Sequence, residues 1–251
     1  MEFTTTFAPG FDGAPLAIHR GGAGRPAILL HGLFSNAEVN WIKYGTAASI
    51  AGAGFDVIMP DLRAHGQSAR PQEAGAYPQD VLVRDLLAII DDLALPSFDL
   101  VGFSLGARTA LRAVSESGLG PRKLVLGGMG LAGIRGWRDR IGFFLDVIDR
   151  YDTIPRDDPA WFAQNFMRST RVDLVATRRL LESFSGAREE DLSRVTMPTL
   201  LVCGTEDDDN GSAEELAAEL PDARFVPIPG THMSSVTMPQ LGREIAAFLT
   251  G

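Results

Sequence analysis

Gly102-Phe103-Ser104-Leu105-Gly106 joins two stretches of different pattern. The residues before it, 98–101, form an apolar run typical of a buried strand, and those after it, 107–113, have a helical pattern. A G-x-S-x-G sequence between a strand and a helix predicts a turn so sharp that the serine side chain projects from the backbone. Glycines flank the serine because a side chain at either position would collide with the neighbouring strand or helix.

Short apolar runs without polar alternation recur along the chain, separated by segments with helical periodicity. This pattern indicates a parallel sheet that is covered by helices on both faces. Residues 2–20 predict an antiparallel hairpin at its start. We expect further strands at 25–30, 55–60, 98–101, 123–128, 199–204 and 224–228, and helices at 41–53, 79–94, 104–117, 212–219 and 238–249. The predicted fold class is therefore α/β, with a doubly wound, mostly parallel sheet.

The periodicity changes after Gly130. Residues 131–195 contain no convincing strand but have amphipathic helical stretches at 140–148, 160–167 and 172–184. Breaks occur near Pro155, Pro159 and Gly186. We expect a helical insertion between two strands of the sheet.

Short polar motifs follow the predicted strands. They are His31-Gly32, the loop from Asp61 to Ser68, Gly204-Thr205-Glu206-Asp207 and Pro229-Gly230-Thr231-His232. With the G-x-S-x-G turn, and in this order, they resemble the α/β-hydrolase family, in its serine-nucleophile, esterase-like branch, over essentially the whole chain. The resemblance implies a core of residues 1–130 and 196–251, with residues 131–195 inserted as a helical cap.

A serine hydroxyl is a poor nucleophile unless a base takes its proton and a third group orients that base. The resemblance assigns Ser104 as the nucleophile, Asp207 as the acid and His232 as the base. The neighbouring carboxylates of Glu206, Asp208 and Asp209 remain alternatives for the acid. The chain has three other histidines: we expect His19 to lie on the surface or to pack, and His31 and His65 to form hydrogen bonds with loop backbone.

Hydrolysis of an acyl compound also needs two backbone donors where negative charge develops on the carbonyl oxygen. The residue after the nucleophile, Leu105, supplies one amide. The family geometry points to the Leu33 amide for the other, with Phe34 as a near alternative. We expect Asp61 and Arg63 to brace the adjacent loop.

The substrate class follows from the aromatic residues around the expected cleft. Phe34, together with Phe144 and Trp161 of the predicted cap, is a candidate wall for an apolar acyl or alcohol group. The sequence therefore predicts a hydrolase of a small carboxylic ester. The same triad would also serve a lactone or a carbon–carbon bond, and a ligand-binding protein with a vestigial triad is a further alternative. The related epoxide hydrolases and dehalogenases use aspartate in place of Ser104.

Composition restricts the partners. The 251 residues carry a formal net charge of −9, which argues against nucleic acids and anionic membranes. Cys203, the only cysteine, lies in a predicted core strand, so it forms no disulfide within the chain and is expected to be unreactive. We expect no metal and no cofactor, a small-molecule ester as the substrate and a cytoplasmic location. The oligomeric state remains open.

Overall fold

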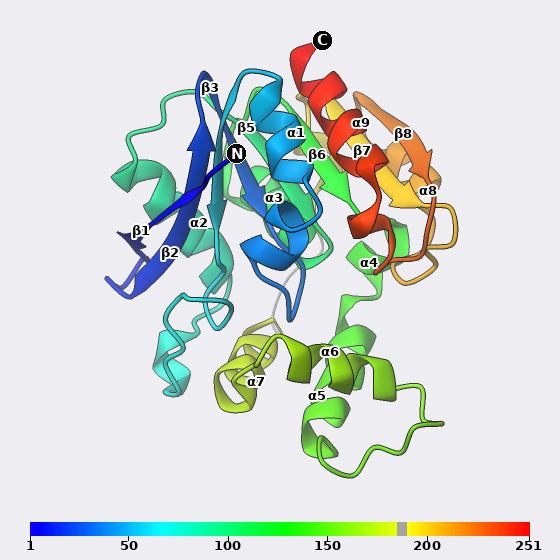
Figure 1. Ribbon diagram of the computed structural model, residues 1–251. Coiled ribbons are helices and arrows are strands. Elements are labelled where there is room, and N and C mark those ends of the chain that lie inside the picture. Colours follow the sequence, from blue (N-terminus) through cyan, green and yellow to red (C-terminus); the bar gives the residue numbers. More distant parts are fainter. Residues whose placement is uncertain (185–189) are drawn as a thin grey trace.

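The computed structural model describes residues 1–184 and 190–251. A single eight-stranded sheet crosses the molecule in the order β1-β2-β4-β3-β5-β6-β7-β8 (Figure 1). The strand β2 is antiparallel to β1 and to β4, and all other neighbours are parallel. The predicted fold class is thereby confirmed. The strands are β1 (Thr4–Pro9), β2 (Pro15–Gly22), β3 (Arg25–Leu30), β4 (Phe55–Pro60), β5 (Asp99–Phe103), β6 (Leu124–Gly127), β7 (Thr199–Gly204) and β8 (Ala223–Ile228).

Helices cover both faces of this sheet because successive strand residues point to opposite sides. In β3, Ile28 and Leu30 belong to one buried cluster, whereas Ala27 and Leu29 belong to the other. The first cluster takes in α2 (Val81–Asp92), α3 (Leu105–Ser117) and α8 (Ala213–Glu219). The second takes in α1 (Thr46–Gly52) and α9 (Pro239–Thr250). The inner parallel strands are thus buried on both faces, which explains the apolar runs in the sequence, whereas the edge strand β8 is only partly buried.

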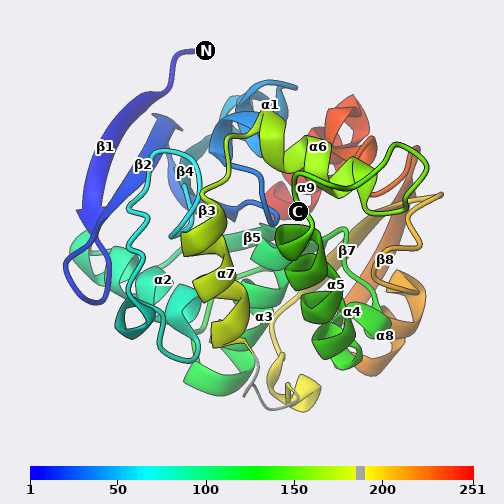
Figure 2. The ribbon, with the colours of Figure 1, turned by 90° about the horizontal axis from the view of Figure 1, so that it is seen from below.

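In the described part of the connection from β6 to β7 there are four α-helices: α4 (Leu131–Arg135), α5 (Trp137–Asp149), α6 (Trp161–Ser169) and α7 (Leu174–Ser183). In Figure 1, α5, α6 and α7 lie below the sheet, and Figure 2, viewed from below, shows them across the middle of the molecule. Apolar residues of these helices, such as Val147 and Leu180, share a buried cluster with Leu126 of β6. The division of the chain at residues 130 and 195 into a core and a cap stays a prediction. The predicted stretch 172–184 corresponds to α7, and Gly186 lies outside the described residues.

The expected helix at 41–53 differs from the structure, which has two short helices there. The first is η1 (Glu38–Ile42) and the second is α1, with Gly45 between them at a φ of 84°. A left-handed residue cannot continue an α-helix, and glycine adopts this conformation without steric cost. Besides η1, which is a π-helix, the described residues form three short 3-10 segments: η2 (Ala74–Ala76), η3 (Leu192–Arg194) and η4 (Ser235–Thr237).

The helix α3 packs unusually closely against the middle of the sheet. A Cβ atom on Gly106 would collide with the backbone carbonyls of Leu30 and His31, and one on Gly102 would collide with the backbone of Gly106 and Ala107. Backbone atoms on both sides cannot yield as a flexible side chain would. The two glycines therefore let α3 begin directly above the ends of β3 and β5.

We predict that Gly106→Ala lowers the free energy of unfolding by roughly 1–3 kcal/mol, because the added methyl group forces α3 away from β3. Gly142→Ala in α5 is the matched control, since a Cβ atom there meets nothing within 4 Å. That control should leave stability unchanged or raise it by up to about 1 kcal/mol. Urea unfolding followed by circular dichroism measures both variants. Equal effects of the two substitutions would contradict the close-packing argument.

Candidate active site

The carboxyl ends of the parallel strands bring the predicted catalytic residues to one edge of the sheet. Ser104 follows β5, Asp207 follows β7 and His232 follows β8. Ser104 and His232 both line a cavity of about 990 Å³, between this edge and the helices α5 and α6. The ring of His232 lies beside Phe103, the residue before Ser104, with a centroid separation of 5.2 Å. Residues far apart in the sequence thus share one cavity.

Ser104 has a strained backbone conformation, with φ at 51° and ψ at −112°. Non-glycine residues in such regions cost on the order of 1–3 kcal/mol and persist only where the surroundings fix them. Here the Ser104 amide donates to the Gly127 carbonyl at 2.8 Å, and the Ser104 carbonyl accepts from the Arg108 amide at 3.0 Å. The strain is held by the strand on one side and by the first turn of α3 on the other.

Asp207 pairs with His232. The Nδ1 atom of His232 lies 2.9 Å from Oδ2 and 3.1 Å from Oδ1 of Asp207. Both side chains are buried, with exposed fractions of 10% for His232 and 2% for Asp207. In the described part of the chain, Glu206, Asp208 and Asp209 form no hydrogen bond or ion pair with His232 through their carboxylates.

Two further residues, Gly128 and Asn210, support this pair. Neither belongs to a recognisable motif, so the sequence did not predict their roles. Gly128 has a φ of 56°, and a Cβ atom there would lie 3.0 Å from Cε1 of His232 and 2.7 Å from Phe103. The buried side chain of Asn210 donates from Nδ2 to the Gly128 carbonyl at 2.7 Å. This hydrogen bond joins the loop that carries Asp207 to the end of β6. A side chain on Gly128 would displace the His232 ring.

The predicted backbone donors lie beside Ser104. In the part of the chain that the structure describes, the amides of Leu33 and Leu105 have no hydrogen-bond acceptor. The Phe34 amide, by contrast, donates to Nε2 of His65 at 3.1 Å, and Phe34 has a left-handed φ of 60°. That hydrogen bond occupies the alternative donor. Of the two candidate donors in this loop, the Leu33 amide is therefore the one without an acceptor among the described residues.

His31 and His65 are buried and bind loop backbone in the same manner. Each lies within hydrogen-bond distance of a carbonyl through Nδ1 and accepts an amide hydrogen at Nε2: His31 from Leu62 at 2.9 Å, His65 from Phe34. An Nε2 acceptor requires the neutral ring with its proton on Nδ1. Burial lowers the pKa of His65 to about 3 and also lowers the pKa of His31. Neither imidazole is thus available as a base.

Asp61 connects the loops on this side of the site. Its carboxylate accepts from the Ala37 amide at 2.8 Å, the Gln67 amide at 2.7 Å and Nε2 of His19 at 3.2 Å. Burial by itself would raise the pKa of Asp61, but these hydrogen bonds and the nearby His31 hold it below its usual value. His19, expected from the sequence to pack or to lie on the surface, is buried against Asp61.

The cavity wall includes two of the three predicted aromatic residues. Phe34 and Phe144 both line it, and their rings meet edge to face with centroids 5.0 Å apart. Trp161 is not among the lining residues; its ring packs against Phe162, which lines the cavity instead. Neighbouring residues of a helix point about 100° apart, and on α6 it is Phe162, not Trp161, that faces the cavity.

Asn40 is a further lining residue with no motif. Its side chain is buried, and Oδ1 accepts from the Gly32 amide at 2.9 Å. This contact fixes the start of the loop that carries Leu33.

Cys203 lies in the core under the site, where burial raises the pKa of its thiol to about 12, so the thiol stays protonated.

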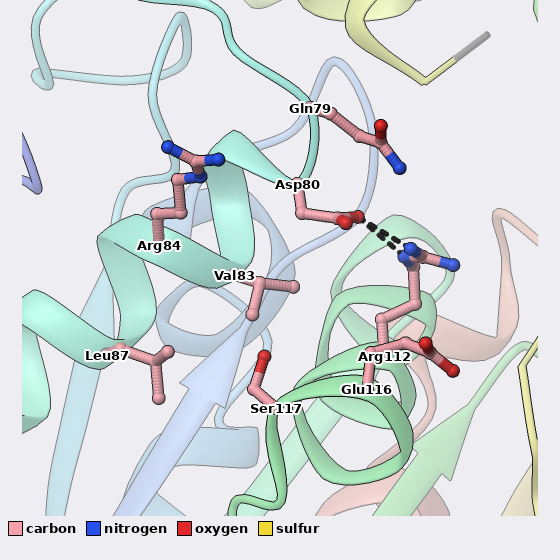
Figure 3. Close-up of a pocket in the computed structure, with 8 residues that line it drawn as sticks. All are labelled: Gln79, Asp80, Val83, Arg84, Leu87, Arg112, Glu116 and Ser117. Atoms are coloured by element: carbon pink, nitrogen blue, oxygen red, sulfur yellow. Dashed lines mark hydrogen bonds and ion pairs between the residues drawn. The ribbon is translucent and has the colours of Figure 1, made fainter. Parts of the chain in front are cut away.

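A second, smaller hollow of about 410 Å³ lies between α2 and α3 (Figure 3). Its lining is largely polar and includes an ion pair of 2.8 Å between Asp80 and Arg112. Ser117 faces it without a histidine among the lining residues. This hollow therefore lacks the nucleophile and base that share the larger cavity.

Comparisons with known proteins agree with this geometry at the level of the family. The model of the alpha/beta hydrolase family matches residues 27–244. An epoxide hydrolase from Caballeronia sordidicola is 34% identical over 102 residues, which are 41% of this chain and 30% of that protein. An N-formylmaleamate deformylase from Pseudomonas putida is 36% identical over 106 residues, 42% of this chain and 38% of that protein. The matches thus span less than two fifths of either relative.

The solved structure of a hydrolase from Pseudomonas aeruginosa has the same fold, with a TM-score of 0.76, 22% identity and coverage of 99% of each chain. No helix in the described segments has both the length and the hydropathy that a membrane span requires. Because the family model covers most of the sequence, this chain belongs to the alpha/beta hydrolase family.

Proposed function

We propose that the protein is a serine hydrolase that cleaves a small carboxylic ester through an acyl-enzyme, with Ser104, His232 and Asp207 as its catalytic triad. The pairing of His232 with Asp207, at the cavity that Ser104 also lines, is the observation that carries the proposal. With its Nδ1 proton directed to Asp207, His232 keeps Nε2 as a proton acceptor. Asp207 also balances the charge of the imidazolium that forms.

The proposed reaction has two stages. Ser104 attacks the ester carbonyl while His232 takes the hydroxyl proton, and the resulting oxyanion binds the amides of Leu33 and Leu105. Leu105 is the first residue of α3, so the helix dipole adds to this stabilisation. His232 then donates the proton to the departing alcohol. Water, activated by the same imidazole, hydrolyses the acyl-enzyme and frees Ser104.

The chemistry of the nucleophile favours acyl transfer over epoxide opening. The epoxide-hydrolase branch uses an aspartate at this turn, whereas this chain has Ser104. The deformylase relative is named for removal of a formyl group, which is also a reaction at a carbonyl carbon. Lactones and carbon–carbon bonds next to a ketone remain second candidates, since the same triad would attack their carbonyl groups.

The rim of the cavity supports an apolar group in the substrate. Tyr44, Phe143, Phe162 and Met233 all line it and are all exposed, by 39% to 77% of their surface. Large apolar side chains exposed together at one opening mark a binding site. An acyl or alcohol chain of several carbons would bury them on binding. The helices α5 and α6, which supply Phe143 and Phe162, would then act as a cap that selects the substrate.

Ser104→Ala should reduce the hydrolysis of p-nitrophenyl esters by a factor on the order of 10⁶, because no nucleophile remains. Ser117→Ala, in the smaller hollow, is the matched control and should retain full activity. A fluorophosphonate should label only Ser104, as read by mass spectrometry of the peptides. Activity of the Ser104→Ala variant within tenfold of the wild type would refute the proposal.

The pH profile should identify the base. His232 must be neutral to accept the Ser104 proton, so kcat/KM should fall as the pH is lowered and the imidazolium forms. His65 has a pKa of about 3, so His65→Gln should keep this acid-side fall, whereas His232→Ala should lose it with most of the rate. Circular dichroism at each pH controls for unfolding. Loss of the acid-side fall in His65→Gln alone would overturn the assignment of the base.

Phe144→Ala should change the relative kcat/KM among acyl chain lengths, by roughly 1–3 kcal/mol for chains that contact the ring. Trp161→Ala is the matched control on the neighbouring helix. Because Trp161 does not line the cavity, this variant should shift all chain lengths alike. The measurement is a series of p-nitrophenyl esters from acetate to octanoate. If the acetate ester loses as much as the longer ones in Phe144→Ala, the ring does not contact the acyl chain.

A further inference from the structure

Arg140 projects from α5 to the wall of the catalytic cavity. It is the only arginine or lysine among the described residues that line this cavity. Its Nη1 atom donates to the backbone carbonyl of Asp209, two residues after Asp207, and its guanidinium lies 5.7 Å from the ring centroid of Phe144. Since Phe144 packs on Phe34, Arg140 lies between the loop of the triad acid and the loop of the Leu33 amide.

One edge of this guanidinium has no partner. The Nε atom is buried and has no hydrogen-bond acceptor, and no contact to Nη2 is found among the described residues. Nε–H and one Nη–H form a planar fork whose spacing matches the two oxygens of a carboxylate. Arg135 of the preceding helix α4, by contrast, is paired: it donates to Glu219 at 2.6 Å.

An unpaired guanidinium in an apolar cavity is costly. Removing a charge from water is unfavourable unless hydrogen bonds and counter-charges offset it, and burial lowers the pKa of Arg140 accordingly. The carboxylates of Asp207 and Asp209 oppose this effect through their field. Asp207 is already committed to His232, and the lining carboxylates of Asp139 and Asp209 are exposed and form no ion pair with Arg140.

We propose that Arg140 binds a carboxylate of the substrate, so that the preferred ester also carries a carboxylate separated from the scissile carbonyl by an apolar chain. This inference rests on the proposed serine hydrolase and names its substrate class. Phe143 and Phe144 would bury the apolar chain, the fork of Arg140 would hold the far carboxylate, and Ser104 would attack the ester at the other end. Arg140 is then a specificity-determining residue and takes no part in proton transfer.

Two series of methyl esters test this assignment. The first contains the monomethyl esters of the linear dicarboxylic acids from succinate to pimelate, and the second replaces the free carboxylate by a neutral primary amide. We expect the wild type to prefer the carboxylate over the amide by roughly 10- to 100-fold in kcat/KM at the best chain length, the range for hydrogen bonds to charged groups. Arg140→Gln should bring this ratio close to one.

Two further variants separate recognition from folding. Arg140→Lys keeps the charge but loses the fork, so it should retain part of the preference. Arg135→Gln, at an exposed ion pair on α4, should keep all of it. A wild type that shows no preference at any chain length would overturn the inference. A preference that survives in Arg140→Gln would also overturn it. So would an equal loss of kcat/KM for both ester series in that variant, because Arg140 would then only stabilise the Asp209 loop.

A binding measurement keeps the inference separate from the proposed catalysis. In Ser104→Ala, calorimetry should detect binding of a free dicarboxylate such as glutarate or adipate. Adding Arg140→Gln to that variant should weaken the binding by about tenfold or more. If the wild type cleaves none of the esters, the proposed function fails, and this comparison still decides the role of Arg140. Absence of dicarboxylate binding to Ser104→Ala, for every chain length, would refute the carboxylate site.

Discussion

The close contact between α3 and the strand ends is the constraint on which the site depends. Gly102 and Gly106 allow the backbones of β5, β3 and α3 to meet without side chains between them. Ser104 is held at a positive φ in the turn between them, where its amide bonds Gly127 and its carbonyl bonds Arg108. A larger separation would relax the strain and also move the Leu105 amide away from the position where the proposed nucleophile would attack a carbonyl group. The positions of the proposed nucleophile and of one proposed oxyanion donor thus follow from one steric condition.

Around this turn the charges are arranged so that only one histidine has a carboxylate partner at the cavity. His31 and His65 are kept neutral by burial and by amides that donate to Nε2. Their tautomer is fixed, which makes them rigid supports for the Leu33 loop. His232 differs because Asp207 accepts its Nδ1 proton and can balance a positive ring. The surroundings, and not the residue type, separate the supporting imidazoles from the proposed base.

The sequence predicted the strands and most core helices because buried parallel strands leave uninterrupted apolar runs. It also placed the triad candidates, since strand ends in this fold meet at one edge and each candidate follows a strand. The sequence did not predict the features that depend on tertiary contacts. The helix at 41–53 is interrupted at Gly45, whose left-handed conformation no periodicity reveals. Whether Trp161 or Phe162 faces the cavity depends on how α6 packs against the rest of the protein. The roles of Asn210 and Arg140 depend on contacts with residues that are distant in the sequence.

The contact between Phe34 and Phe144 joins two parts of the molecule that have different roles in the proposed reaction. The backbone of Phe34 belongs to the loop beside Ser104, whereas Phe144 belongs to α5 and lines the cavity from the other side. A substitution on α5 that moves this ring also loosens the neighbour whose amide is held by His65. A change of substrate range in this protein would therefore need paired substitutions on α5 and in the Leu33–Phe34 loop. A substitution in only one of them would alter selectivity and lower the turnover rate at the same time.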